Sequence, residues 1–232
     1  ITGANDSLID GSQTTTITVS VVDESSNDSF DSLADQTVSV STADDDTAAF
    51  TVTQSDGSTS VDESGSTDTF TVVLDAQPTS DVVLSVSSGD TGEATVSPAT
   101  LTFTSGNWDS AQTVTIAGVD DDAVDGDQGT TTTLSVVDES SDDSFDAAAD
   151  VTVSVTTTDD DTAGFTVTQS GGSTSVDESE STDTFTVVLD AQPTSDVVLS
   201  VSSGDTGEAT VSPATLTFTS GNWDSAQTVT IT

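Results

Sequence analysis

Lysine, arginine, histidine, cysteine, methionine and tyrosine are all absent from the 232 residues. Without cysteine there is no disulfide framework and no thiolate metal site. Without histidine or lysine there is no imidazole base and no amine for a Schiff base. The lack of basic side chains excludes a phosphate clamp and a nucleic-acid-binding surface, and no apolar run approaches the roughly 18 residues of a membrane span. We expect no enzyme, no small-molecule substrate, no nucleic-acid partner and no membrane insertion.

What the chain does contain is acid: 42 Asp and Glu residues give a formal net charge of −42. Val, Ile, Leu and Phe together are 52 residues, or about 22%. This share lies just above the roughly 20% below which a highly charged chain is expected to be disordered. No side chain can form a salt bridge within such a sequence. If the chain folds, we expect cations from solution to compensate its charge.

The chain is an internal repeat with a period of 115 residues. Residues 50–115 recur as 165–230 with only two differences in 66 positions, at 56/171 and 65/180. A period of domain size is typical of a tandem array of modules. The first 46 residues align more loosely with 116–161, and no initiator Met opens the chain, so we expect a window of a longer array. The predicted division is 1–46, the C-terminal part of one repeat; 47–161, a complete repeat; and 162–232, the N-terminal part of the next.

Each period has the pattern of short β-strands, because alternating β-branched runs are bounded by Gly, Pro, Ser and Asp. The strands expected in the complete repeat are Phe50–Gln54, Ser58–Asp62, Asp68–Leu74, Asp81–Ser87, Ala94–Thr104, Gln112–Val119, Thr130–Val137 and Val151–Thr157. Strands of this number and length predict an all-β fold of tandem antiparallel two-sheet β-sandwich modules, similar to immunoglobulin domains. A closed barrel is the alternative.

Antiparallel order places the acidic loops of each repeat at one end. Successive strands alternate in direction, so the loops near 63, 90, 120–127 and 159–161 all fall at the end where the chain leaves the module. Clustered carboxylates repel one another, at about 4 kcal/mol for a pair 4 Å apart in an environment of effective dielectric 20. Hard cations relieve this repulsion, and Ca²⁺ accepts 6–8 oxygen ligands in irregular cages. The alternative is that these Asp runs are solvated loops or an acidic surface of the halophile type.

We predict several Ca²⁺ ions per repeat. The candidate ligands of the complete repeat are Glu63, Asp90, Asp120, Asp121, Asp122, Asp125, Asp127, Asp159, Asp160 and Asp161. Their counterparts in the partial repeats are Asp6, Asp10, Asp44, Asp45, Asp46, Glu178 and Asp205.

The order of these motifs along one full period resembles a Calx-β domain. The motifs are Val61-Asp62-Glu63-Ser64, Gly89-Asp90, the run from Ala99 to Gly106, Val119-Asp120-Asp121-Asp122, and the closing Asp159-Asp160-Asp161. They also resemble the repeats of giant secreted bacterial adhesins of the RTX type. The resemblance implies Ca²⁺ ligands at Glu63, Asp90, Asp120, Asp121 and Asp159–Asp161. This sequence departs from the family in the loop after Asp122, where it has Asp125 and Asp127 in place of several Glu residues.

The sequence thus favours a mechanical role. We expect a Ca²⁺-stiffened spacer or fibre shaft of a long extracellular adhesin or filament at the cell surface. Its partners would be the neighbouring repeats of the same chain and other copies in a fibre. Two alternatives are a glycan-binding adhesin module and a Ca²⁺-sensing regulatory module. Near-identical tandem copies favour the spacer.

Overall fold

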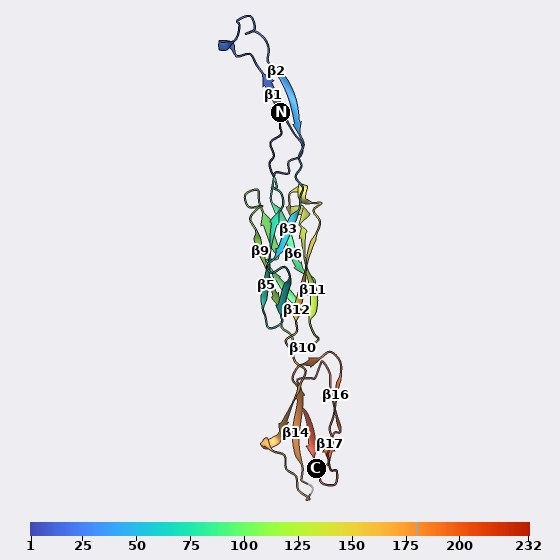
Figure 1. Ribbon diagram of the computed structural model, residues 1–232. Coiled ribbons are helices and arrows are strands. Elements are labelled where there is room, and N and C mark those ends of the chain that lie inside the picture. The colour runs from blue at the N-terminus through green and yellow to red at the C-terminus, as the bar shows by residue number, and fades with distance from the viewer. Residues whose placement is uncertain (180) are drawn as a thin grey trace.

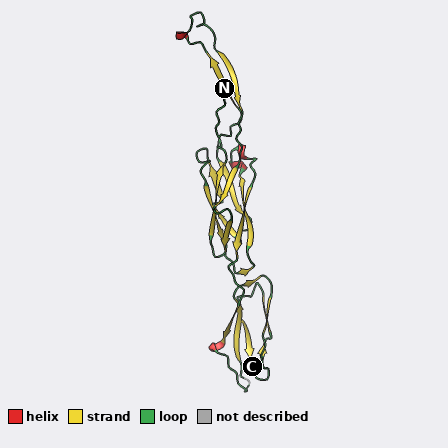
Figure 2. Ribbon diagram, in the orientation of Figure 1, coloured by secondary structure: helices red, strands yellow, loops and turns green. Residues whose placement is uncertain are grey.

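The computed structural model, which describes residues 1–179 and 181–232, is a long, narrow rod (Figure 1). An N-terminal hairpin, a central β-sandwich and a C-terminal β-unit follow one another along its length. Strands dominate, and the short helical turns lie in loops (Figure 2). No helix among the described residues has the length and apolar character needed to cross a membrane.

The central sandwich has two sheets. The first has the order β3-β5-β9-β7, with β3 (Phe50–Gln54), β5 (Thr67–Leu74), β9 (Gln112–Gly118) and β7 (Ala94–Ser97). The second has the order β4-β12-β11-β6-β8, with β4 (Thr59–Asp62), β12 (Val151–Thr158), β11 (Gln128–Val136), β6 (Val82–Ser88) and β8 (Thr100–Phe103). Neighbouring strands are antiparallel except β12 and β4, which run parallel. The predicted two-sheet sandwich is confirmed.

The core lies between these sheets and follows from alternation along each strand. On β5, Phe70, Val72 and Leu74 are buried, because every second side chain points to the same face. Leu84 on β6 and Leu134 on β11 meet them from the opposite sheet within the same buried cluster. These strands thereby fix the positions of the loops at both ends of the sandwich.

One expected strand is divided in the structure. The segment predicted as one strand over 94–104 forms β7 and β8, which belong to different sheets. Pro98 stands between them, and proline has no N–H for a sheet ladder, so the chain crosses there. The two separate strands predicted at Phe50–Gln54 and Ser58–Asp62 form β3 and β4, which lie in opposite sheets on either side of a turn at 55–58.

The chain ends form incomplete versions of this sandwich. The N-terminal hairpin pairs β1 (Gln13–Val19) with β2 (Gln36–Thr42). The C-terminal unit has one sheet of β13 (Phe165–Gln169), β14 (Asp183–Leu189), β19 (Gln227–Ile231) and β17 (Val211–Ser212), and a pair of β16 (Val197–Ser200) and β18 (Thr215–Phe218). Short helical turns occupy Asp23–Ser25, Asp138–Ser140, Asp143–Phe145 and Ser170–Gly172. The predicted repeat boundaries remain a prediction.

The end of the central module nearer the N-terminus is closed by a buried carboxylate. Asp142 accepts hydrogen bonds from the backbone N–H groups of Thr79, Ser80 and Ser144, and from the hydroxyls of Thr79 and Ser144. Although burial opposes ionisation, these donors hold the pKa of Asp142 well below its usual range. This acid is fully satisfied by protein groups and needs no cation.

Candidate metal centre

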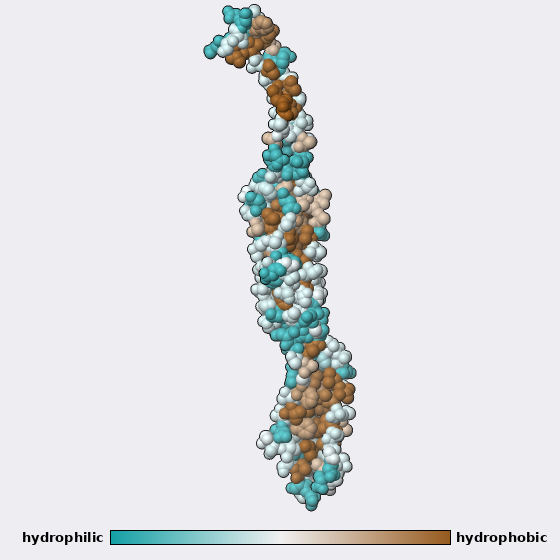
Figure 3. All heavy atoms as spheres, in the orientation of Figure 1, coloured by the Kyte–Doolittle hydropathy of each residue, from teal (hydrophilic) through white to brown (hydrophobic). Residues whose placement is uncertain are grey.

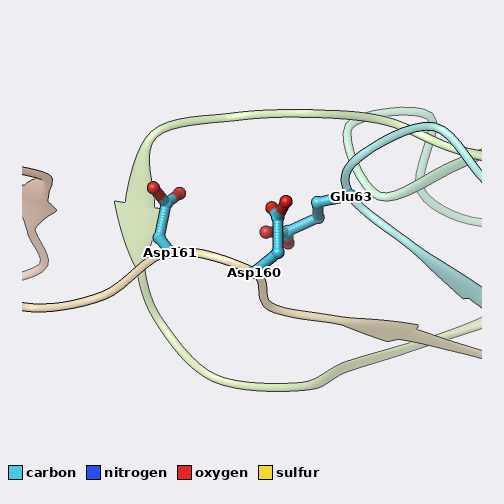
Figure 4. Close-up of side chains that lie close together, drawn as sticks. All are labelled: Glu63, Asp160 and Asp161. Atoms are coloured by element: carbon cyan, nitrogen blue, oxygen red, sulfur yellow. The ribbon is translucent and has the colours of Figure 1, made fainter.

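The opposite end of the central module gathers acidic side chains, and three of them, Glu63, Glu93 and Asp161, each have a buried oxygen without a hydrogen-bond partner. Glu63 follows β4, while Asp160 and Asp161 follow β12, the parallel neighbour of β4. Parallel strands end at the same edge of a sheet, so the three side chains meet there. Each offers an oxygen within 4.8 Å of the other two. Figure 4 shows Glu63 reaching across toward Asp160, with Asp161 next to it along the same segment.

Glu63 is the best-defined member of this group. Its side chain is only 1% exposed, and its Oε2 has no hydrogen-bond partner. Burial is the main cause that raises the pKa of Glu63 to about 7, and the carboxylates of Asp121, Asp159 and Asp125 raise it further. The backbone N–H of Asp160 acts in the opposite direction. A buried acid with an unused oxygen among like charges is costly unless an external cation pairs with it.

Two further carboxylate oxygens are buried without partners, Oε2 of Glu93 and Oδ2 of Asp161. Burial raises the pKa of each group, and neighbouring acids add to the effect. The charges acting on Glu93 are Asp125, Asp90 and Asp121, so its carboxylate faces the same loops. Glu93 was not among the ligands predicted from the sequence. The signal was present, because it follows Asp90 by three residues in the same end loop.

Several predicted ligands instead organise the loops around this centre. Asp159 accepts from the backbone N–H groups of Gly126, at 2.7 Å, and Asp161, at 2.8 Å, which ties the loop 120–127 to the exit segment. Asp121 accepts from Ala123 N at 2.6 Å. Asp90 accepts from Gly92 N at 2.9 Å. Each of these bonds leaves the carboxylate with further lone pairs for a cation.

The other predicted ligands of the repeat are Asp120, Asp122, Asp125 and Asp127. All four are exposed. The charges of Asp125 and Asp122 reach the buried acids, since Asp125 acts on Glu63 and Asp122 on Asp161. Asp120 and Asp127 lie in the same exposed loop.

The partial repeats hold separate halves of the centre. Asp44 in the N-terminal hairpin repeats the role of Asp159, accepting from the N–H groups of Gly11 at 2.7 Å and Asp46 at 2.9 Å. The hairpin also carries the other predicted residues Asp6, Asp10 and Asp45. The C-terminal unit carries Glu178 and Asp205, both exposed. Glu178 and the Asp run therefore do not meet within this chain, in contrast to Glu63 and Asp160.

This donor set fits a hard divalent cation. All of the nearby side-chain donors are carboxylates, three of their oxygens are buried without partners, and the loops lie at an irregular sandwich end. Ca²⁺ takes 6–8 oxygen ligands at such sites, whereas Mg²⁺ demands nearly ideal octahedral geometry. Glu63, Asp160 and Asp161 would hold the ion, and the charges of Asp121 and Asp125 act on both Glu63 and Glu93 nearby.

The same end also makes the contact between successive modules. The short strand β10 (Ala123–Val124) in the acidic loop pairs with β15 (Gln192–Pro193) of the C-terminal unit, and Gln192 N donates to Asp122 O at 2.6 Å. One period earlier, Leu8 bridges Gln77, and Gln77 N donates to Ser7 O at 2.6 Å. The two junctions of the chain are thus built in the same way.

Comparison with protein-family models and with curated protein sequences finds no match. Similar solved structures include the apo form of the Calx CBD1 domain, 17% identical with a TM-score of 0.34, covering 48% of this chain and 98% of that chain. The calcium binding domain CBD12 of CALX1.1 is 19% identical with a TM-score of 0.36, covering 78% and 74%. SSP-19, an MSP-domain protein like family member in Caenorhabditis elegans, is 15% identical with a TM-score of 0.32, covering 46% and 97%.

Proposed function

We propose that this chain is a structural segment of a long extracellular adhesin or filament, in which bound Ca²⁺ stabilises the acidic end of each β-sandwich and stiffens its link to the next module. The observation that carries the proposal is the repeated junction. Both junctions use the loop that also contributes to the acidic centre, and both pair it with the Gln-Pro turn of the following module. A shaft needs this kind of repeated geometry, whereas a single binding site does not.

The junction and the cation centre share a short segment. Asp121 lies among the charges around Glu63, and the next residue, Asp122, accepts the hydrogen bond from Gln192 of the following unit. An ion held by the buried carboxylates would fix the loop 120–127, because Asp159 already ties that loop to the exit segment. A fixed loop would hold β10 against β15. Without the cation, repulsion among these acids would loosen the loop and let the modules swing.

The extracellular location and the adhesin role rest on composition and on the resemblance to adhesin repeats. Calcium reaches millimolar concentrations outside cells, where sites with dissociation constants of 10⁻⁴–10⁻³ M are occupied. A chain with 42 acids and no basic residue suits such a medium, and its high net charge keeps extended molecules apart in solution. The acidic groups recur in every repeat, which favours a role in the shaft over catalysis.

X-ray scattering of the 232-residue chain tests the stiffening. We expect a larger maximum dimension and a narrower distance distribution in Ca²⁺ than in chelator, at concentrations where the chain is monomeric. Replacing Asp160 and Asp161 by Asn should remove this difference. The matched control, Glu139→Gln with Asp150→Asn, removes the same charge from exposed positions at the other end of the module and should keep it. Equal inter-module flexibility with and without Ca²⁺ would refute the stiffening role.

A further inference from the structure

The complete repeat contains two Asp-Gly pairs, Asp56-Gly57 and Asp125-Gly126. The peptide bond of such a pair is chemically labile in water, because glycine has no Cβ to shield its backbone nitrogen from the neighbouring side chain. Both glycines have a left-handed φ, +79° at Gly57 and +76° at Gly126, which a residue with a Cβ rarely adopts. The turn therefore requires glycine at both places, and the lability comes with it.

The reaction of an Asp-Gly pair runs through a cyclic imide, a succinimide. The glycine N–H and the aspartate carboxyl group condense: the bond from N to Cγ forms, a C–O bond at Cγ breaks, and water leaves. Water then opens the ring at one of its carbonyl carbons and restores either aspartate or isoaspartate. In isoaspartate the backbone runs through Cβ and Cγ, and the former backbone carbonyl is a free carboxylate. Water is released and then consumed, so the net charge is unchanged and no other reactant is needed.

In the loop 120–127, the peptide group between Asp125 and Gly126 is held on both sides. Its N–H donates to Asp159 Oδ2 at 2.7 Å, and its carbonyl oxygen accepts from Gln128 Nε2 at 3.2 Å. These two hydrogen bonds form a clamp. Ring closure requires the peptide plane to turn about the Cα–C bond of Asp125 into a region that folded backbones rarely populate, and this turn would break both bonds. The Asp159 carboxylate also disfavours the loss of the proton from the attacking nitrogen, since it places a negative charge beside it.

The same clamp is present one period earlier. Gly11 N–H donates to Asp44 Oδ2 at 2.7 Å, and Gln13 Nε2 donates to Asp10 O at 2.8 Å. The acid and the amide that hold this peptide group are the repeat counterparts of those that hold the group at 125–126. The clamp therefore belongs to the acidic loop as a recurring feature.

The pair Asp56-Gly57 has a different environment. It lies in the exposed turn at 55–58, between β3 and β4. Among the described residues, hydrogen bonds are found neither to the carbonyl oxygen of Asp56 nor from the N–H of Gly57. The peptide plane between them is therefore free to turn toward ring closure.

We propose that Asp56-Gly57 is a site of spontaneous isoaspartate formation, and that Asp159 and Gln128 protect the chemically identical pair at 125–126 from the same reaction. The consequences of reaction differ between the two places. At 56 the longer backbone falls in an exposed turn. At 125 it would move Gly126 away from Asp159 and disturb the loop that carries β10. Figure 3 shows hydrophilic surface where the central module adjoins the C-terminal unit, the end at which this loop lies.

A bound cation would strengthen the clamp, a step that rests on the proposed function. Asp159 adjoins Asp160, one of the three acids of the candidate centre. An ion held there would fix the exit segment and, with it, the carboxylate that accepts from Gly126 N–H. We therefore expect isoaspartate to form faster at Asp125 in chelator than in Ca²⁺.

Prolonged incubation of the unaltered chain in water enriched in a heavy oxygen isotope tests the proposal, because each ring opening incorporates one oxygen atom from the solvent. Asp-N endoproteinase cleaves before aspartate but not before isoaspartate, so peptide masses report each site separately. In Ca²⁺ we expect isoaspartate at Asp56 and little at Asp125. Asp159→Ala should raise the rate at Asp125 by about tenfold or more, the factor that corresponds to a lost hydrogen bond to a charged group. Gln128→Ala should raise it by a smaller factor.

Two controls keep the test specific to the clamp. The rate at Asp56 is the reference within each molecule and should be the same in all variants. Asp142→Asn destabilises the other end of the module, where Asp142 anchors the turn at Thr79 and Ser80, and should leave the rate at Asp125 unchanged. If Asp159→Ala unfolds the acidic end, Gln128→Ala still releases the peptide group without removing a carboxylate.

Equal rates at Asp56 and Asp125 in the unaltered chain, or a rate at Asp125 that neither Asp159→Ala nor Gln128→Ala changes, would overturn the protection. A module that Ca²⁺ stabilises, but in which Asp125 reacts as fast as Asp56, would overturn it and leave the proposed function standing. Rates at Asp125 that are equal in Ca²⁺ and in chelator, yet rise in both variants, would support the clamp and refute the part of the cation. Absence of isoaspartate at Asp56, over a period in which the denatured chain forms it, would refute the reactive site.

Discussion

Residues 50–115 and 165–230 share 64 of 66 residues but do not have the same structure. In the central copy, 59–62 form β4, and Glu63 is buried at its end. In the C-terminal copy, 174–177 form no strand, and Glu178 is exposed. The difference between the two copies is explained by a partner strand. In the central copy β4 pairs in parallel with β12, and residues 174–177 have no such partner within this chain. Local sequence alone therefore fixes neither the strand nor the cation centre.

The two sheets of the sandwich also depend on different segments of the sequence. The sheet β3-β5-β9-β7 is reproduced by β13-β14-β19-β17 with nearly the same register, since all of its strands lie within 50–118 or its counterpart. The other sheet needs β11 and β12, which come later in the chain. Without them only β16 and β18 remain paired. The second sheet and the acidic end of a repeat therefore both depend on β11 and β12.

Chelation should produce the largest effect that distinguishes the two copies. A bound ion stabilises the folded state by RT ln(1+[L]/Kd), or about 4 kcal/mol at a thousandfold excess over Kd. Under monomeric conditions we expect chelator to lower the unfolding free energy of the central module by about this amount per ion. Hydrogen exchange, followed by peptide for each copy, should show lost protection at 59–63 and no change at 174–178. Equal changes in both copies would contradict the assignment of the centre.

Matched substitutions should give the next largest effect. Glu63→Gln removes the buried charge and should abolish most of the Ca²⁺-dependent rise in melting temperature. In chelator the same variant should melt no lower than the unaltered chain, because the uncompensated carboxylate is gone. Glu178→Gln makes the same change in a nearly identical local sequence and should alter neither melt while the chain is monomeric. Calorimetry with and without Ca²⁺ measures both variants.

Much of this fold could be predicted from the sequence. Alternation along segments such as 67–74 identified the strands, and their antiparallel order placed the loops near 63, 90, 120–127 and 159–161 at one end. The division at Pro98 was missed, because the apolar alternation continues through 94–104 on both sides of it. The parallel pairing of β4 with β12 was also missed, since neighbouring strands were expected to be antiparallel.

The candidate site was predicted at the level of loops rather than side chains. Composition and order identify the acidic end, but they do not distinguish a carboxylate that caps backbone N–H groups, such as Asp159, from one whose oxygen is left free, such as Glu63. That distinction depends on backbone positions contributed by segments nearly 100 residues apart. Glu93 is an acid with a free buried oxygen that was not predicted. Its burial beside Ala94 follows only from the packing of β7.

A third and smaller difference in stability between the two copies is expected from Asp142. It anchors the turn at Thr79 and Ser80, whereas no acid among the described residues bonds to the same turn at Thr194 and Ser195. Hydrogen bonds to a charged group contribute about 1.5–3 kcal/mol, so Asp142→Asn should lower the unfolding free energy of the central module by about that amount.

The pH dependence of this loss has a definite sign. The folded-state pKa of Asp142 is depressed, so its contribution is present above the unfolded-state pKa of about 3.9 and is lost as the pH falls toward the folded-state pKa. The stability difference between the unaltered chain and Asp142→Asn should therefore shrink below about pH 4. Denaturant unfolding at a series of pH values measures it. A difference that grew in acid would show that the carboxylate is not held in its ionised form.

The smallest expected effect comes from the sequence difference between the copies at position 56/171. Asp56 is exposed in the turn between β3 and β4, and its counterpart is Gly171. Asp56→Gly increases the freedom of the unfolded chain, which costs about 0.4–1 kcal/mol. It should leave β4 formed and Glu63 buried, because β12 still provides the ladder and the core still covers Val61. Exchange protection of Thr59–Asp62 and the Ca²⁺ dependence of the melt should both persist. If Asp56→Gly removed them, the turn sequence rather than the absent hairpin would explain why the second copy has no strand at 174–177.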